Sequence, residues 1–322
     1  MQMKGFVSME NYRKCGIVGC GFVGATCAFT LATSGLFSDM VLLDVNVEKA
    51  KGEAMDISHS ISFAKPCKVI SGDYADLAGC AIVIIAAGAN QKPGETRIDL
   101  LNRNAKILQS IIHSISQHNP DCILLVVSNP VDILTHMSLK ISGFPPERVI
   151  GTGTVLDTAR LKYLLGRYLK VDTRNVHAFI IGEHGDSELA VWSSANISGV
   201  DLMDFCKLQG EAWDPAALHR IYENVRDAAY EIIAGKGATY YGIGMAVLRI
   251  VEAIVRDEHS VLPVSTMISG HYDLSGLCLS IPSIIGKNGV ERVLDIPLDP
   301  AEKKSLLESA EKLQNVLAEL QL

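Results

Sequence analysis

The sequence predicts an α/β protein in which a doubly wound parallel sheet is followed by a mixed α+β domain. In the first half of the 322 residues, short continuous apolar runs alternate with longer helical patterns. Such runs are typical of strands covered on both faces, and right-handed crossovers between them produce a doubly wound sheet. The order of elements changes after GTGT (151–154). We therefore expect a first domain over 1–151 and a second domain over 152–322.

Each element follows from its local pattern. The apolar runs that predict strands in the first domain are 15–19, 40–44, 68–71, 81–88 and 122–128. The helical patterns between them are 22–35, 46–60 and 97–118. The second domain has helical patterns at 156–169, 212–234 and 238–256, and strand-like pieces at 175–181, 188–192, 260–268 and 276–281.

The end of the chain predicts a structural helix. Asp299 is suited to the N-cap, Pro300 to the first turn, and Glu302 completes a capping pattern. One face of this helix is apolar and carries Leu306, Leu313, Leu317 and Leu320. We assign this helix no chemistry.

Composition and charge disfavour several classes of protein. The chain has 29 basic and 36 acidic residues, and this balance supplies no field that would gather nucleic acid or anionic lipid, so we expect neither as a partner. The opening MQMKGFVSMENYRK lacks the apolar core of a signal peptide, and no apolar run is long enough for a membrane helix, which predicts a cytoplasmic protein. The eight cysteines form no C-x-x-C pair. We expect reduced core cysteines and no metal site.

The segment GIVGCGFVG lies directly between the first expected strand and the first expected helix. It places Gly19, Gly21 and Gly24 in the spacing G-x-G-x-x-G, where a tight turn, a close pyrophosphate and a tightly packed helix each exclude a Cβ. Asp44 ends the second strand, where its carboxylate can accept hydrogen bonds from a ribose diol and would repel a 2′-phosphate. A glycine-rich turn beside a surface aspartate is the structural alternative. The setting favours a Rossmann domain that binds NAD rather than NADP.

Two segments of the second domain carry groups suited to a small carboxylate substrate. In VLDTAR, Asp157 and Arg160 are three residues apart, so both can point from one helical face into the same cleft. The guanidinium of Arg160 can bind a carboxylate through two parallel hydrogen bonds. In GEHGDS, His184 lies between two glycines, and Asp157 facing it would fix its tautomer and favour its protonated form. Taken singly, an intrahelical ion pair and a structural loop histidine are the alternatives.

Seven motifs together resemble the L-lactate and malate dehydrogenase family, and especially its bacterial L-lactate dehydrogenases. They are GCGFVG, LLDVN, AAGANQKPGETR, VVSNPVD, GTGTVLDTAR, IIGEHGDS and GATYYGIG, in the family's order and spacing. The resemblance covers nearly the whole chain. It implies a homotetrameric, NAD-dependent L-2-hydroxy-acid oxidoreductase that transfers hydride reversibly between NADH and pyruvate, giving L-lactate.

The resemblance also implies the roles of the catalytic residues. His184 would donate a proton to the substrate carbonyl oxygen and take it back in the reverse reaction, with Asp157 as its partner charge. GANQKPGETR resembles the family's mobile loop, and on closure Arg97 would stabilise the negative charge that develops on the carbonyl oxygen. The alternative for Arg97 is a solvated arginine in the first turn of a helix, where the helix dipole does not favour a cation.

Gln91 bears on the choice of substrate. The family typically has arginine at this position where the substrate has a second carboxylate, as malate does, and glutamine where it ends in a methyl group. A neutral amide would leave a carboxylate of oxaloacetate unpaired in a site of low dielectric, which is costly. The substrate contacts that the resemblance implies are Gln91, Arg97, Asn129, Arg160 and Thr239. The cofactor contacts are Gly19, Gly21, Phe22, Val23, Gly24, Asp44, Gly88, Ala89, Asn129 and Ile243.

One departure from the family bears on regulation. Allosteric bacterial members bind fructose 1,6-bisphosphate between subunits through an arginine and a histidine, at positions that here are Lys162 and His177. Lys162 keeps the positive charge but loses the bidentate fork of arginine. His177 could equally be a satisfied core residue. The pair is a candidate effector site.

Four other functions compete with this interpretation. Gln91 argues against a malate dehydrogenase, whereas a dehydrogenase for bulkier 2-hydroxy acids stays open. The related NAD-using glycosidases would need metal-binding Cys and His in place of the arginine pair. A non-catalytic NAD-binding descendant would be expected to have lost one of His184, Asp157, Arg160 or Arg97, and the sequence has all of them.

Overall fold

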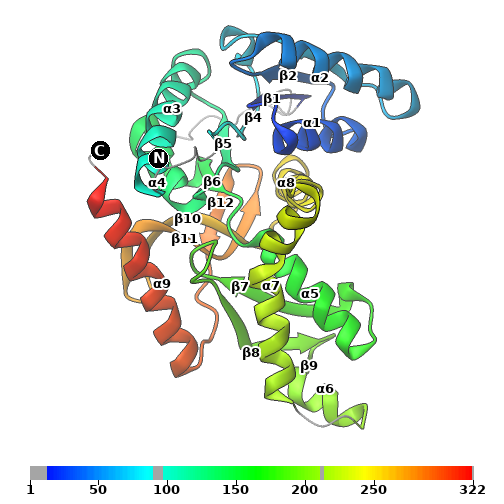
Figure 1. The fold of residues 1–322 in the computed structure, drawn as a ribbon, viewed down its shortest axis with the longest axis vertical. Coiled ribbons are helices and arrows are strands. Elements are labelled where there is room, and N and C mark those ends of the chain that lie inside the picture. The colour runs from blue at the N-terminus through cyan, green and yellow to red at the C-terminus, as the bar shows by residue number, and fades with distance from the viewer. Residues whose placement is uncertain (1–12, 90–96, 211–213, 321–322) are drawn as a thin grey trace, which may run out of the picture.

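The computed structural model describes residues 13–89, 97–210 and 214–320. Within these residues, nine strands form one sheet in the order β12-β11-β10-β6-β5-β4-β1-β2-β3 (Figure 1). They are β1 (Lys14–Val18), β2 (Asp39–Leu43), β3 (Lys68–Ser71), β4 (Ile82–Ile85), β5 (Ile123–Val126), β6 (Val149–Gly151), β10 (Ser260–His271), β11 (Leu274–Gly286) and β12 (Gly289–Val293).

Strands β1 to β6 are paired in parallel in the doubly wound order 3-2-1-4-5-6. The predicted fold class is thereby confirmed. One face packs against α3 (Arg97–His118) and α4 (Val131–Ser142), and the other against α1 (Phe22–Ser34) and α2 (Val47–Ser60). All four residues of β4 are buried because both faces are covered.

Beyond β6 the sheet becomes antiparallel. β10 pairs with β6 and with β11, and β11 pairs with β12. The sequence pattern assigns 260–268 and 276–281 to a separate mixed domain, whereas β10 and β11 extend the parallel sheet. Gly151 permits this junction, because a Cβ there would lie 2.9 Å from that of Ser265 on β10.

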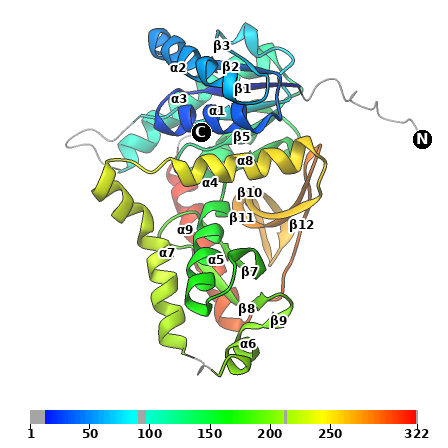
Figure 2. The same ribbon diagram turned by 90° about the vertical axis from the view of Figure 1, so that its right-hand side faces the viewer.

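A second sheet, β7-β8-β9, forms the lower part of the molecule in Figure 1. Its strands are β7 (Val176–Ile181), β8 (Leu189–Ile197) and β9 (Val200–Asp201), and the helices around it are α5 (Val155–Leu169), α6 (Leu202–Leu208) and α7 (Pro215–Lys236). α8 (Tyr241–Val255) runs between α1 above and α5 below (Figure 2). Short 3₁₀ turns lie at η2 (Ile61–Phe63), η3 (Ala75–Leu77), η4 (Pro146–Arg148) and η5 (Thr173–Asn175).

Helix α9 (Pro300–Glu319) has the predicted capping box. The Asp299 side chain accepts a hydrogen bond from the backbone N–H of Glu302, and the Glu302 side chain accepts one from the backbone N–H of Asp299. Glu302 also accepts hydrogen bonds from the N–H groups of Trp192 and Ser193 on β8, at 2.8 and 2.9 Å. Leu306 and Leu313 are buried as predicted. The helix is therefore fixed to the second sheet.

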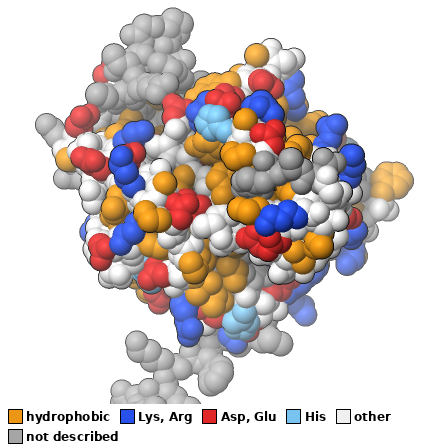
Figure 3. Space-filling model, turned by 90° about the horizontal axis from the view of Figure 1, so that it is seen from below, with side chains coloured by type: hydrophobic (Ala, Val, Ile, Leu, Met, Phe, Trp, Pro, Cys, Tyr) orange, Lys and Arg blue, Asp and Glu red, His pale blue; other side chains and the backbone are white. Residues whose placement is uncertain are grey.

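All eight cysteines are free and buried, which confirms the expectation of reduced core residues. Burial raises the pKa of the Cys27 thiol to about 12. Across the described part of the chain, no helix is both long enough and apolar enough to cross a bilayer. At the end of the molecule farthest from the parallel sheet, acidic and basic side chains are interspersed (Figure 3).

Candidate active site

The loop that carries His184 begins where β7 ends at Ile181. Gly182 has φ +93°, and a Cβ on it would lie 2.9 Å from the Ser309 hydroxyl oxygen on α9. The backbone and the packing of α9 therefore require this glycine. Ser309 also accepts a hydrogen bond from the Glu183 N–H at 2.8 Å. Helix α9, to which the sequence assigned no chemistry, thus supports the histidine loop.

A second carboxylate, Asp132 on α4, holds the backbone of His184. The His184 N–H donates to Asp132 Oδ2 at 2.8 Å, and the Ser280 hydroxyl donates to Oδ1 at 3.2 Å. Asp132 is buried, and its desolvation raises the pKa of the carboxyl group despite these hydrogen bonds. Sequence reasoning missed Asp132; its only signal is an acid within the apolar stretch NPVDIL.

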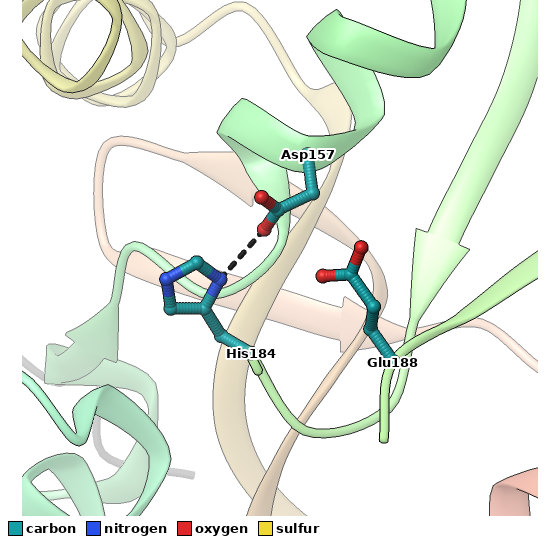
Figure 4. Close-up of side chains that lie close together, drawn as sticks. All are labelled: Asp157, His184 and Glu188. Atoms are coloured by element: carbon teal, nitrogen blue, oxygen red, sulfur yellow. Dashed lines mark hydrogen bonds and ion pairs between the residues drawn. The ribbon is translucent and has the colours of Figure 1, made fainter. Parts of the chain in front are cut away.

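The Asp157 carboxylate joins the histidine to the arginine, and Figure 4 shows its contact with the histidine. Its Oδ2 lies 2.6 Å from His184 Nδ1, and its Oδ1 accepts a hydrogen bond from Arg160 at 2.7 Å. Asp157 and Arg160 come from α5, and His184 from the loop after β7, so the structure brings these three predicted residues together. The intrahelical ion pair considered from the sequence is also present.

This geometry controls the protonation of His184. Burial by itself would lower the pKa of the imidazole, but the charge and hydrogen bond of Asp157 raise it to about 9. Burial acts to raise the pKa of Asp157, yet His184 and Arg160 lower it overall. The other ring nitrogen, Nε2, points away from Asp157 (Figure 4). The raised pKa favours an imidazolium at neutral pH, in which the Nε2–H is not used by Asp157.

The glycine-rich turn after β1 fits a dinucleotide. A Cβ on Gly24 would lie 1.8 Å from the Gly19 carbonyl oxygen, so only glycine lets α1 pack this closely on the turn. A Cβ on Gly21 would meet no heavy atom within 4 Å among the described residues. Gly21 is the N-cap of α1 and offers no side-chain cap, which leaves the first N–H groups of the helix available to an anion.

Asp44, directly after β2, is held toward the same turn. It accepts hydrogen bonds from the N–H groups of Cys20 at 2.7 Å and Asn46 at 2.9 Å. Gly88 and Ala89 follow β4, and Asn129 follows β5. These residues and the glycine-rich turn lie at the carboxyl ends of parallel strands, the edge at which open α/β sheets bind ligands.

Three further predicted contacts lie on α1 and α8. Val23 and Ile243 are half-buried and pack against one apolar cluster. The ring of Phe22 is exposed and stacks on Tyr240, with centroids 5.4 Å apart. Since that ring is engaged with Tyr240, the backbone N–H is the group of Phe22 suited to a cofactor phosphate. Thr239 is half-buried just before α8.

Of the two site residues predicted in the mobile loop, the structure describes one in part and the other not at all. Gln91 is outside the described residues. The backbone of Arg97 begins α3, as the sequence predicts, and its side chain is not among those described.

The candidate effector residues Lys162 and His177 line one cavity of about 560 Å³ between α5, β7 and α8. His177 is exposed, so it is not the satisfied core residue considered from the sequence. Arg249 lines the same cavity, and its guanidinium is also hydrogen-bonded to Glu258 and Ser260. Burial, followed by the charge of Arg249, lowers the pKa of Lys162. An anion in the cavity would relieve this repulsion.

Comparisons with known proteins match both halves of the chain to one protein family. Residues 13–151 match the family model of the lactate/malate dehydrogenase NAD-binding domain, and residues 154–321 match that of the lactate/malate dehydrogenase alpha/beta C-terminal domain. The chain is 53% identical to an L-lactate dehydrogenase of Acetivibrio thermocellus, over 96% of this chain and 98% of that protein. It is 50% identical to L-lactate dehydrogenase 1 of Clostridium acetobutylicum, over 96% and 99%.

Solved structures give the same result. The crystal structure of a minor L-lactate dehydrogenase from Enterococcus mundtii, in a ligand-bound form, superposes with a TM-score of 0.94 at 42% identity, covering 97% of this chain and all of that one. A lactate dehydrogenase from a deep-sea metagenome library of the Medee basin superposes with a TM-score of 0.93 at 44% identity, covering 95% and 98%. The chain therefore belongs to the lactate/malate dehydrogenase family.

Proposed function

We propose that the protein catalyses the NAD-dependent interconversion of pyruvate and L-lactate. The observation that carries this proposal is the Asp157 carboxylate, which contacts His184 at 2.6 Å and Arg160 at 2.7 Å. It thereby fixes a proton donor next to a carboxylate-binding guanidinium, and a 2-oxo acid needs both groups at adjacent atoms. The names of the relatives, L-lactate dehydrogenases at 50–53% identity, support the same reaction.

Each residue of the site has a separate role in the proposed reaction. NAD, when bound, supplies or accepts the hydride at the substrate carbon. Arg160 binds the substrate carboxylate with the N–H groups that Asp157 does not use. His184 Nε2 donates its proton to the carbonyl oxygen and recovers it in lactate oxidation, while Asp157 stabilises the imidazolium. We assign to Arg97 the stabilisation of charge on the carbonyl oxygen.

Substrate choice rests on Gln91 and Thr239. The neutral amide of Gln91 offers no partner to a second carboxylate, so oxaloacetate would leave a charge unpaired. Thr239 would restrict the bulk of the substrate's small end. We therefore propose pyruvate as the preferred 2-oxo acid.

The reaction is tested by its product. Purified protein incubated with NADH and excess pyruvate should form one L-lactate per NADH consumed, measured by chiral chromatography of the mixture. Formation of D-lactate, or NADH consumption without lactate, would contradict the proposal. Boiled protein gives the background rate.

The two glycines of the turn make separable predictions. Gly24→Ala should lower both the melting temperature and the affinity for NADH, because its Cβ would lie 1.8 Å from the Gly19 carbonyl oxygen. Gly21→Ala should leave the melting temperature of the free protein within a few degrees of wild type but weaken NADH binding, since its Cβ enters open space that a pyrophosphate would occupy. Calorimetry and fluorescence titration measure the two effects. Equal NADH affinity of Gly21→Ala and wild type would contradict the assigned site.

Self-association is supported by apolar side chains on α1 and α8, which lie side by side. Phe22 and Phe29 on α1 are 71% and 49% exposed, and Tyr241 and Met245 on α8 are 68% and 59% exposed. Large exposed apolar groups on adjacent helices are typical of interfaces between subunits. We propose a homotetramer, as the family resemblance implies.

We also propose that fructose 1,6-bisphosphate binds in the cavity lined by Lys162 and His177 and activates the enzyme. Lys162→Met should abolish activation while leaving the rate without effector within about twofold of wild type, because Lys162 is assigned no contact with the substrate. Arg167→Met removes a cation from the same helix but not from the cavity, and should still be activated. Initial rates across a bisphosphate titration measure this. Undiminished activation of Lys162→Met would contradict the assignment.

A further inference from the structure

Glu188 is a buried carboxyl group that the proposed reaction does not use. It precedes β8, is 4% exposed, and its Oε1 has no hydrogen-bond partner in the described structure. The Tyr222 hydroxyl on α7 donates to the backbone carbonyl of Glu188, which fixes this residue in place. An unpartnered buried carboxyl oxygen is costly in free energy, so its presence beside a reactive site calls for a reason.

The group that faces Glu188 is the catalytic pair. One polar atom from each of Asp157, His184 and Glu188 lies within 4.8 Å of the other two. In Figure 4 the carboxyl group of Glu188 is turned toward that of Asp157. The other ionisable groups that act on Glu188 are Arg160 from α5, and Tyr222 and Arg226 from α7.

The nearby cations are paired with other acids. Arg160 is bound to Asp157 at 2.7 Å, and Arg226 to Asp227 at 2.9 Å. Two buried carboxyl groups this close do not both ionise readily, so one of them keeps a proton. Asp157 contacts both His184 and Arg160, and it therefore keeps the negative charge. Burial and the charge of Asp157 raise the pKa of Glu188 to about 9.

We propose, on the basis of the reaction assigned above, that Glu188 is a positioning residue: a neutral carboxylic acid whose O–H is directed at the Asp157 carboxylate. Such a donor draws negative charge from Asp157 and so weakens its hold on the His184 proton. An ionised Glu188 would do the opposite, because its charge would add to that of Asp157 in retaining the proton.

Arg160 also stabilises the charge of Asp157, by donating a hydrogen bond to Oδ1 at 2.7 Å. In the proposed reaction the remaining N–H groups of Arg160 bind the substrate carboxylate, so the contact with Asp157 persists when substrate is bound. The O–H proposed for Glu188 adds a further donor to the same carboxylate.

Two variants separate this role from packing. Glu188→Gln keeps an N–H donor, and its kcat for pyruvate reduction at neutral pH should stay within about threefold of wild type. Glu188→Met fills a similar volume without a donor. Its kcat should fall about tenfold with little change in KM for pyruvate, and the alkaline limb of its kcat/KM profile should lie at higher pH than that of Glu188→Gln.

Infrared spectroscopy detects a protonated carboxyl group directly, and the measurement needs no substrate. Wild type at neutral pH should show the C=O band of a buried protonated carboxyl group, and Glu188→Gln should lack it. The proposal is overturned if the band is absent from wild type, or if Glu188→Met matches Glu188→Gln in both kcat and pH profile. Melting temperatures check that both variants are folded. If wild type showed the band but did not reduce pyruvate, the proposed function would fail while the protonation of Glu188 stood.

Discussion

Replacing His184 with alanine is expected to lower kcat for pyruvate reduction by about 10³-fold, because a positioned general acid typically contributes 10²- to 10⁴-fold. The affinity for NADH should stay within about threefold, since the glycine-rich turn lies between β1 and α1, away from the histidine loop in the sequence. Stopped-flow or steady-state absorbance at saturating pyruvate measures the rate, and fluorescence titration measures NADH binding. A variant within tenfold of wild type would remove His184 from the reaction.

The same histidine sets the pH dependence. In the proposed mechanism pyruvate reduction uses protonated His184, so kcat/KM should fall as pH rises through about 9, whereas lactate oxidation uses the neutral ring and should rise over the same range. The free energy of unfolding also depends on the protonation of His184. Because the folded pKa is raised, the His184–Asp157 pair contributes fully to the free energy of unfolding below about pH 6.5, and this contribution is lost as pH rises toward 9. His184→Ala should lack both transitions.

Replacing Arg160 with lysine is expected to lower kcat/KM for pyruvate by about 10²-fold. Lysine keeps the charge but cannot donate to Asp157 and to both oxygens of a carboxylate in one fixed plane. Hydrogen bonds to charged groups contribute about 1.5–3 kcal/mol each, and every 1.4 kcal/mol is tenfold.

The control for this change is Arg167→Lys, on the same helix, which should keep wild-type kinetics because no substrate contact is assigned to it. Saturation curves with pyruvate at fixed NADH measure both variants. If Arg160→Lys matched Arg167→Lys, the carboxylate would have to be bound elsewhere.

Local patterns predicted the parts of the structure that local contacts determine. The alternation of apolar runs and helices gave the parallel half, and the capping box of Asp299 and Glu302 follows from neighbouring residues. By contrast, α4 was not predicted; its residues 131–139 are all buried, so no exposed face marks it as a surface helix. Strand β6 has only three residues, too few for a pattern.

Contacts between distant segments explain what the sequence did not show. The spacing of Asp157 and Arg160 on one helix indicated that they act together, the loop GEHGDS indicated His184 as the partner of Asp157, and the family motifs added the catalytic role of His184. The support of His184 by Asp132, 52 residues earlier, and of its loop by Ser309 on α9 depends on how α4 and α9 pack. The unpartnered carboxyl oxygen of Glu188 likewise becomes visible only when burial is known.

The central claim is that this enzyme reduces pyruvate in preference to other 2-oxo acids. Initial rates of NADH oxidation with pyruvate, oxaloacetate and a branched 2-oxo acid, measured in parallel with and without fructose 1,6-bisphosphate, test it most directly. We expect the highest kcat/KM for pyruvate, because the neutral side chain of Gln91 offers no charge to a second carboxylate. A higher kcat/KM for oxaloacetate or for the branched acid would contradict the assigned substrate.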